Sequence, residues 1–386
     1  KAYEYGWQRY AEAMGMTLVN DTGEDGSCPN GAPAGSGPNP FTDWVYVVDI
    51  ERFVSLSTCK KYSEGAFNRM QMPAGYSMNG EKSAAAGFFR SEYTRKVETL
   101  SYLPGHDQFI KTDAAETAVN VWTPPRLEPP TGVTDADIRT WLDHIENLIP
   151  DPHARQHVLD WIAHVVQRPD QKPNHALFLG GWQGIGKDLA LQPVYQAVGA
   201  QNTTNVEPDD LQSSWSDWIN GKRLIVVQEM RSFDRKTVMN NLKPFIATPP
   251  DRITIRERHV NSYQLPNVAA FVFMSNYPDA IALEQGDRRY FVYWSPMEPQ
   301  SPSYYKNLAD WLDTGGKEKV CGWLNERNIA AFHPRADPPE TAAKRDMLLE
   351  SQPEPVREIF DTIQAGERPF AGEAVALQDA VEMTQF

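Results

Sequence analysis

The sequence contains few cysteines, no long apolar run and no excess of positive charge, and each absence narrows the class of protein. Its three cysteines are widely spaced and form no C-x-x-C motif or pairing with histidine, which predicts a reducing cytoplasm and no zinc site. No apolar run approaches the roughly 18 residues that a membrane span needs. We therefore expect a protein without a membrane partner.

The chain has 386 residues and a net charge of −14, with 41% hydrophobic and 23% charged residues. These values are typical of a globular protein of two or three domains. The negative charge argues mildly against a surface coated with nucleic acid, but it is compatible with a local positive field in a channel or on a hairpin. The first residue is Lys1 and no secretory signal follows, so we expect a fragment of a longer cytoplasmic protein.

A proline-rich run at residues 123–130 is the best domain boundary in the sequence. Before it we expect an accessory α+β module at residues 1–123. After it, apolar residues at helical spacing predict two amphipathic helices that lead into an α/β domain at residues 131–300. Further helical patterns indicate a helical C-terminal region at residues 301–386.

Residues 181–188 match the G-x-x-x-x-G-K core of a Walker A phosphate-binding loop, with Asp188 where serine or threonine normally follows the lysine. An apolar run at 176–179 predicts a strand before the loop, and 188–198 predicts a helix after it. This order directs backbone N–H groups and the helix dipole at a phosphate. We therefore expect a nucleotide site rather than an ordinary turn, formed by Gly181, Gln183, Gly184, Ile185, Gly186, Lys187 and Asp188.

Two further apolar strands end in polar residues that can serve such a site. The strand at 223–227 leads to Gln228 and Glu229, and a carboxylate there can position Mg²⁺ or polarise the attacking water. The strand at 271–275 leads to Asn276, whose amide can hold that water or contact the γ-phosphate. Either strand can also simply meet a polar turn. Beside a P-loop we favour Glu229 as the catalytic carboxylate, and both interpretations of Asn276 stay open on the residues alone.

Basic residues occur in two further places. The adjacent Arg288 and Arg289 are either a solvated pair or a source of a guanidinium that acts in trans on a γ-phosphate. Residues 253–265 alternate apolar and polar side chains around Asn261-Ser262, which predicts a β-hairpin. Its tip carries Arg256, Arg258 and His259, which form either a solvated edge or a contact with DNA.

In this order the motifs resemble those of superfamily 3 helicases, a branch of the AAA+ ATPases, and in particular the primase-helicases of phages and mobile elements. The likeness covers residues 130–300 and implies a P-loop core with a parallel sheet flanked by helices. It assigns the Walker A motif to residues 181–187 and the Walker B motif to residues 224–229. It makes Asn276 sensor 1 and Arg288 or Arg289 the arginine finger, with Arg289 favoured because an aromatic residue follows it.

The resemblance also implies the partners. It makes the segment from Lys243 through the hairpin a DNA-binding element, with Lys243, Arg256, Arg258 and His259 as candidate contacts. Members of the family form hexameric rings, bind ATP and Mg²⁺, and grip single-stranded DNA with the hairpin in the central channel. The resemblance further suggests an associated primase domain or replication partner and, for a phage protein, the cytoplasm of a bacterial host.

Two residues depart from the family pattern. Asp188 replaces the Mg²⁺-binding serine or threonine of Walker A, and Gln228 replaces the first acidic residue of Walker B. A carboxylate lost from the strand end thus reappears on the loop. Our hypothesis is that Asp188 and Glu229 together organise Mg²⁺, the former directly or through water. The competing interpretation is that the site binds nucleotide but no longer hydrolyses it.

The leading interpretation is an ATP-driven DNA helicase or translocase that works as a ring. The alternative is a nucleotide-gated assembly or loading factor on DNA with little or no unwinding. A P-loop small-molecule kinase is disfavoured because it would explain neither the hairpin nor Asn276. Primase activity within this chain is poorly supported, since Asp49 and Glu51 lack a convincing set of further metal ligands.

Overall fold

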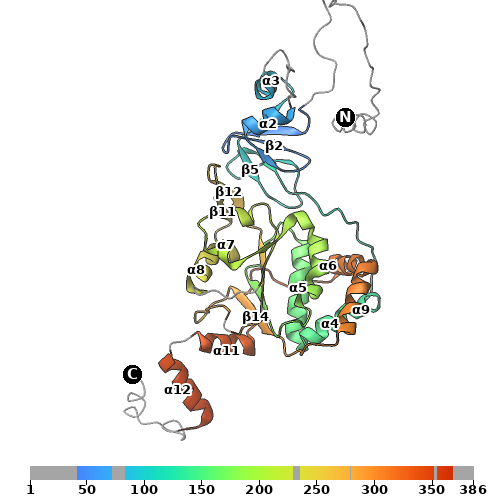
Figure 1. Cartoon of the computed structure of the whole chain (residues 1–386), viewed down its shortest axis with the longest axis vertical. Coiled ribbons are helices and arrows are strands. Elements are labelled where there is room, and N and C mark those ends of the chain that lie inside the picture. The colour runs from blue at the N-terminus through green and yellow to red at the C-terminus, as the bar shows by residue number, and fades with distance from the viewer. Residues whose placement is uncertain (1–40, 72–82, 229–234, 279, 352–353, 368–386) are drawn as a thin grey trace, which may run out of the picture. The chain divides into compact units, whose positions relative to one another are not determined.

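The computed structural model describes residues 41–71, 83–228, 235–278, 280–351 and 354–367 (Figure 1). They belong to a compact unit that runs from Phe41 to Phe386. None of the helices in these ranges is long and apolar enough to cross a membrane.

An α+β module precedes the P-loop domain. One of its sheets has the strand order β3-β2-β1-β4 and the other has the order β5-β7-β6. The module contains β1 (Trp44–Val47), β2 (Arg52–Ser55), β3 (Lys61–Tyr62), α2 (Glu64–Gln71), α3 (Ala84–Arg90), β4 (Arg95–Val97), β5 (Thr99–Ser101), β6 (Phe109–Lys111) and β7 (Thr117–Asn120). Aromatic side chains form the core between the helices and the first sheet, where Phe53 stacks on Phe67 with ring centroids 3.9 Å apart.

Five parallel strands form the central sheet in the order β14-β8-β13-β10-β9. They are β8 (Ala176–Gly180), β9 (Thr203–Val206), β10 (Leu224–Gln228), β13 (Ala270–Ser275) and β14 (Tyr290–Trp294). Apart from the edge strand β9, the strands are largely apolar because helices cover both faces of a parallel sheet. The first strand in sequence, β8, lies in the interior of the sheet, so the loop that follows it opens between neighbouring strands.

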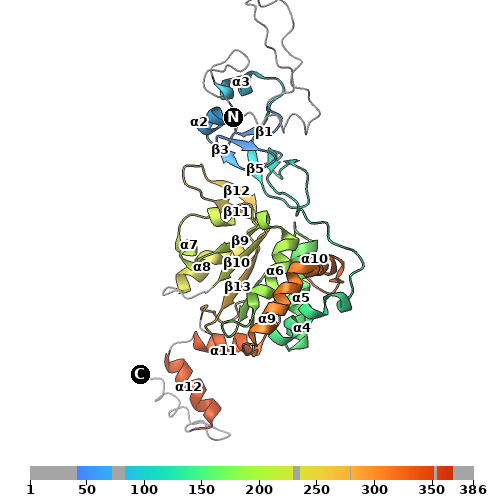
Figure 2. The same cartoon turned by 45° about the vertical axis from the view of Figure 1, so that its right-hand side comes forward.

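Helices cover the two faces of this sheet unequally. In Figure 2, α7 and α8 lie on one side of the strands, and α5, α6 and α10 lie on the other. The helices of this domain are η1 (Asp135–Ile138), α4 (Arg139–Leu148), α5 (Pro152–Gln167), α6 (Lys187–Val198), η2 (Ala200–Asn202), α7 (Pro208–Gln212), η3 (Asp217–Ile219) and α8 (Arg235–Ile246). The predicted α/β core with a parallel sheet and flanking helices is confirmed.

The described part of the chain after residue 300 is mainly helical, as predicted. It contains α9 (Pro302–Trp311), the irregular turn η4 (Leu312–Gly316), α10 (Lys317–Glu326), α11 (Ala342–Glu350) and α12 (Glu354–Ala365). Leu308, Val320 and Leu324 belong to the same apolar core as α4, α5 and α6. The chain after the sheet therefore folds back onto the helices that precede it, and α9 comes to lie beside the P-loop.

The predicted β-hairpin is present. Its strands are β11 (Arg252–Ile255) and β12 (Tyr263–Pro266), which pair antiparallel. The connection covers residues 256–262, so the expected tight turn at Asn261-Ser262 is wrong. The ladder ends early because Arg256 and Glu257 turn to partners outside the hairpin: the backbone N–H of Arg256 donates to Ser216, and the Glu257 carboxylate accepts from Lys61.

A buried arginine, Arg223, connects the start of β10 to the end of α5 and to the segment before β13. Arg223, directly before β10, is 1% exposed, and burial lowers its pKa to about 10, so it stays charged near neutral pH. Among the described residues, its guanidinium donates to four backbone carbonyls, those of Val165, Arg168, Gln171 and Val268. The first three lie at and just beyond the C-terminal end of α5, where the helix dipole favours positive charge.

We expect Arg223→Met to lower the free energy of unfolding by about 3 kcal/mol or more, because several buried carbonyls lose their donor at about 1–3 kcal/mol each. Urea unfolding near neutral pH measures the change. Replacement of the exposed Arg335 by methionine is the matched control, with an expected change within about 0.5 kcal/mol. A loss in Arg223→Met as small as that of the control would contradict this account.

Candidate functional site

A pocket of about 310 Å³ opens at the carboxyl ends of β8, β10 and β13. This edge is where open parallel sheets bind ligands, because the loops after neighbouring strands converge there. Its lining consists of Gln183, Gly184, Ile185, Gly186, Lys187, Asp188, Leu189, Gln228, Met274, Ser275, Asn276 and Tyr305. The structure thus brings together the P-loop residues and Asn276, which are far apart in the sequence.

The ammonium group of Lys187 connects three parts of this pocket. It donates to the carbonyls of Gly181 (2.8 Å) and Trp182 (3.1 Å) and to Oδ1 of Asn276 (2.7 Å). An ammonium has three N–H donors, so these contacts satisfy all of them. Burial lowers the pKa of Lys187 to about 8.

Gly186 brings the P-loop against the helices behind it. Its φ of +83° lies in the left-handed region, and an added Cβ would come within 2.7 Å of the His144 ring. The buried His144 places Nε2 3.0 Å from the Gly186 carbonyl and Nδ1 3.0 Å from the Tyr304 hydroxyl. Because a carbonyl only accepts, Nε2 carries the proton and Nδ1 accepts from Tyr304. Burial lowers the pKa of His144, which agrees with this neutral form.

Sequence reasoning missed His144 on α4 and both Tyr304 and Tyr305 on α9. The signal for His144 was present, because it shares the apolar face of α4 with Trp141 and Ile145. Tyr305 had no signal in the sequence, since it reaches the pocket only through the return of α9 to the P-loop.

The two residues that depart from the family pattern are neighbours at the candidate site. Nε2 of Gln228, at the end of β10, lies 3.5 Å from Oδ1 of Asp188, the second residue of α6. The same carboxylate oxygen accepts from Tyr195 at 3.2 Å. Asp188 therefore stands beside the position that the Walker B carboxylate occupies in the family pattern. Glu229, predicted as catalytic carboxylate and metal ligand, lies outside the described residues.

The two candidate finger arginines, Arg288 and Arg289, lie at the amino ends of the strands, whereas the pocket lies at the carboxyl ends. They precede β14, whose first residue pairs with Ala176 at the start of β8 and whose last pairs with Gly180 at its end. A strand of this length spans roughly 15 Å, so neither arginine adjoins the P-loop of its own chain. Arg289 is 32% exposed and bonded to Asp287, whereas Arg288 is 69% exposed with Asp337 at 3.9 Å.

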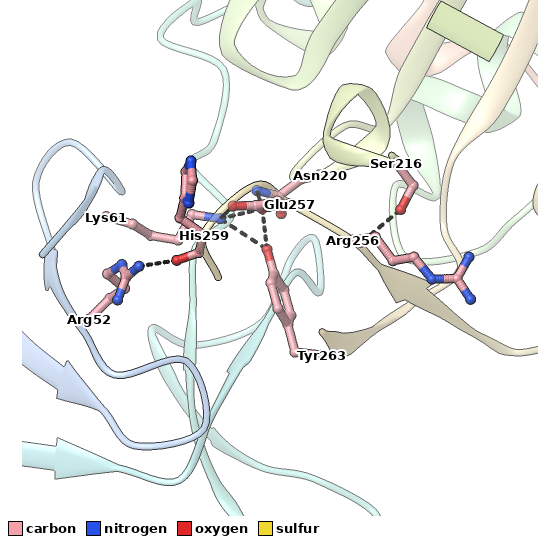
Figure 3. Close-up of polar contacts among 8 residues, drawn as sticks. All are labelled: Arg52, Lys61, Ser216, Asn220, Arg256, Glu257, His259 and Tyr263. Atoms are coloured by element: carbon pink, nitrogen blue, oxygen red, sulfur yellow. Dashed lines mark hydrogen bonds and ion pairs between the residues drawn. The ribbon is translucent and has the colours of Figure 1, made fainter. Parts of the chain in front are cut away.

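The tip of the hairpin is held by the N-terminal module (Figure 3). The Glu257 carboxylate accepts from Lys61 of β3, from Tyr263 (2.6 Å) and from Asn220 (2.8 Å). Burial lowers the pKa of Lys61, while the adjacent Glu257 opposes that change. Arg52 donates to the carbonyl of His259. The module thus fixes the backbone of the tip through one partly buried ion pair and further hydrogen bonds.

The predicted DNA contacts fall in two places. Arg256, Arg258 and His259 are exposed on the tip, although the Glu257 between them is largely buried. His259 has a φ of +60°, so the tip turns sharply there. Lys243 lies instead on α8 and pairs with Glu284 at 3.0 Å. The structure groups the three hairpin residues and leaves Lys243 on a separate element.

The known proteins that resemble this chain include a phage replication enzyme. Residues 178–289 match a family described as a family of unknown function, DUF5906. The DNA primase-polymerase of Nitratiruptor phage NrS-1 is 23% identical over 137 residues, which are 35% of this chain and 19% of that protein. The chain therefore matches a phage primase-polymerase over only about a fifth of the relative's length.

Solved structures with a similar fold come from the same phage protein. The apo structure of the NrS-1 C-terminal region has a TM-score of 0.65 at 15% identity, and the match covers 83% of this chain and 74% of that one. An apo structure of its A form also has a TM-score of 0.65, at 13% identity, with 88% and 81% covered. At this identity the likeness shows the fold alone.

We expect the affinity of the site for nucleotide, measured without Mg²⁺, to fall by up to about fivefold between pH 8 and pH 9. The cause is the pKa of Lys187 of about 8. Below it the ammonium is charged and attracts phosphate, and above it the neutral amine does not. Titration with a fluorescent ATP analogue measures the profile. The Lys187→Arg control keeps its charge and should bind independently of pH in this range. A flat profile for the unaltered protein would refute this explanation.

Proposed function

We propose that this chain is an ATP-driven DNA helicase or translocase of a phage or mobile element, and that it works as a ring. The observation that carries the proposal is the 2.7 Å contact between Lys187 and Asn276 within one pocket, which joins a P-loop to a second polar strand end. Such a pair can bind the phosphates of ATP and respond to the loss of the γ-phosphate. The similarity to a phage primase-polymerase supports a role in phage DNA replication.

The residues present suit ATP and Mg²⁺. The first turn of α6 has free N–H groups for phosphate, and Lys187 adds positive charge. Mg²⁺ in nucleotide sites takes one or two carboxylates together with phosphate oxygens. Asp188 supplies one such carboxylate, and Glu229 would supply the other. When bound, the metal would neutralise charge on the phosphates. Gln228 would orient Asp188, and Asn276 would hold the attacking water.

The ring completes the site. Arg288 and Arg289 lie at the opposite end of the strands from their own P-loop. In the ring they would act on the γ-phosphate bound by a neighbouring copy. Single-stranded DNA would then pass the tips that carry Arg258 and His259. Contacts of these residues with phosphates carry little sequence information, so translocation should be largely independent of sequence.

A second candidate is a nucleotide-gated loading factor that binds DNA without unwinding it. The partly buried pair between Lys61 and Glu257 favours it, because a hairpin held by the N-terminal module has limited freedom to move. Strand displacement separates the two candidates: a helicase opens a forked duplex with ATP, and a loading factor does not.

We expect single-stranded DNA to stimulate ATP hydrolysis, and Lys187→Ala to abolish hydrolysis with and without DNA because the phosphates lose their cation. A phosphate-release assay and strand displacement on a forked duplex measure the two activities. The double variant Arg258→Ala with His259→Ala should keep basal hydrolysis and lose the stimulation. Unchanged stimulation in that variant would remove the hairpin from the proposal, and an inert unaltered protein would refute the function.

The ring is tested in the same assay by mixing two inactive variants. Lys187→Ala chains keep the arginines, and chains with Arg288→Ala and Arg289→Ala keep the P-loop. Mixed rings would contain some complete sites, so the mixture should recover part of the hydrolysis rate. No recovery, with native mass showing mixed oligomers, would argue against action between subunits.

We expect Asp188→Ala to lower the rate of ATP hydrolysis by roughly 10- to 100-fold, because the carboxylate beside Gln228 is lost. Asp188→Ser should retain much of the rate. The double variant Asp188→Ser with Gln228→Glu moves the carboxylate back to the strand end and should be at least as active as Asp188→Ser. Normal hydrolysis by Asp188→Ala would show that the loop carboxylate has no part in holding the metal.

A further inference from the structure

An open groove lies on the far side of the hairpin from the Lys61–Glu257 pair. It has a volume of about 710 Å³ and lies between α8, the loop after α7, and β11. Its aromatic lining is Trp215, Trp218 and Phe245, and its cations are Arg252 and Arg256. The proposed nucleotide site uses none of these residues.

The groove lacks the negative charge that dominates the chain. The protein has 51 acidic residues and a net charge of −14. Nevertheless, no described residue of the lining is Asp or Glu, and the polar remainder consists of hydroxyl and amide side chains such as Ser213, Asn240 and Asn241. The charged side chains that line the groove are therefore both cations, which favours an anionic ligand over a cationic one.

The aromatic residues give the groove a stacking surface. Trp215 is 38% exposed although it lines the groove. Trp218 packs edge-on against Phe245 with ring centroids 5.4 Å apart, so it is held in place. An exposed indole beside arginines is the combination on which single-stranded nucleic acids bind, with bases stacked on the ring and phosphates on the cations.

The loop that carries Trp215 is fastened to the hairpin. Ser216 donates its backbone N–H to the Arg256 carbonyl at 3.0 Å, and its hydroxyl oxygen accepts from the Arg256 backbone N–H at 2.9 Å. The same hydroxyl donates to the Thr254 carbonyl at 3.2 Å. In Figure 3 the Arg256 side chain points away from the Glu257 cluster. Trp215 and Arg256 therefore form one unit that any movement of the hairpin would carry along.

We propose that this groove binds single-stranded DNA, with a base stacked on Trp215 and phosphates bound by Arg252 and Arg256. The inference rests on the proposed action of the chain on DNA and adds a second contact to that of the hairpin tip. The tip would grip the backbone through Arg258 and His259, and the groove would hold the bases of the adjoining nucleotides. Because every base has a stacking face, this contact is also independent of sequence.

The test is the affinity of the full chain for a fluorescein-labelled oligothymidine, measured by anisotropy without nucleotide. Trp215→Ala should weaken binding by roughly tenfold, in line with the loss of one stacked base. Trp215→Phe keeps an aromatic face and should bind nearly as well as the unaltered chain. Arg252→Ala should reduce the slope of log affinity against log salt by about 1. Tyr93→Ala removes an aromatic residue that is 82% exposed on the N-terminal module, and it should change nothing.

The outcomes separate this inference from the proposed function. If the unaltered chain binds the oligonucleotide and Trp215→Ala binds it equally well, the groove is not a DNA site, while the proposed function stands. If the unaltered chain binds no single-stranded DNA, both fail. If Trp215→Ala affects only binding of an oligouridine RNA, the choice of DNA is overturned. Weaker DNA binding by Trp215→Ala and recovery in Trp215→Phe support the groove.

Discussion

The contact between Gly186 and His144 is the constraint on which the geometry of the P-loop pocket depends. No side chain larger than hydrogen fits at that point of the loop, and the imidazole holds the Gly186 carbonyl from behind. Tyr304 holds the other ring nitrogen, and Asn147 donates to the Tyr304 hydroxyl at 3.2 Å. Two helices that are distant in sequence, α4 and α9, thereby fix the start of α6, from which Lys187 and the free N–H groups point into the pocket.

In the hairpin, two adjacent side chains point in different directions and make different contacts. Glu257 turns inward to Lys61 and Tyr263, and Arg256 turns outward to the groove. This ion pair is partly buried, and removing one partner would leave the other charge poorly solvated. The pair therefore sets the direction in which the neighbouring cations face. The N-terminal module is in this sense a support for the hairpin. Its contact also restrains the hairpin, so movement of the hairpin would either carry the module with it or break the ion pair.

Local patterns predicted most of the fold, and long-range packing decided the rest. The glycine loop, the apolar strands and the helical spacing were sufficient for the P-loop core, because each is a signal within a few residues. The length of the loop that connects the two hairpin strands was not predictable, since it depends on contacts with Lys61 and Ser216 elsewhere in the chain. Tyr305 lines the pocket because α9 packs beside the P-loop. The pattern of apolar residues along the sequence does not reveal that packing. The proximity of Asp188 and Gln228 agrees with the idea of an exchanged carboxylate, but their roles in catalysis remain predictions.

The order of the strands determines where a second copy would be needed. Parallel pairing of β14 with β8 places the P-loop at one end of the strands and Arg288 and Arg289 at the other. In the part of the chain that the structure describes, β14 is an edge strand and has a strand neighbour on one side alone. A guanidinium at that edge can approach a γ-phosphate only if the phosphate belongs to another chain. Any catalytic role for these arginines therefore requires an assembly. Arg288 is the more exposed of the two and lies farther from its acidic partner, so its side chain is freer to extend to a neighbouring chain.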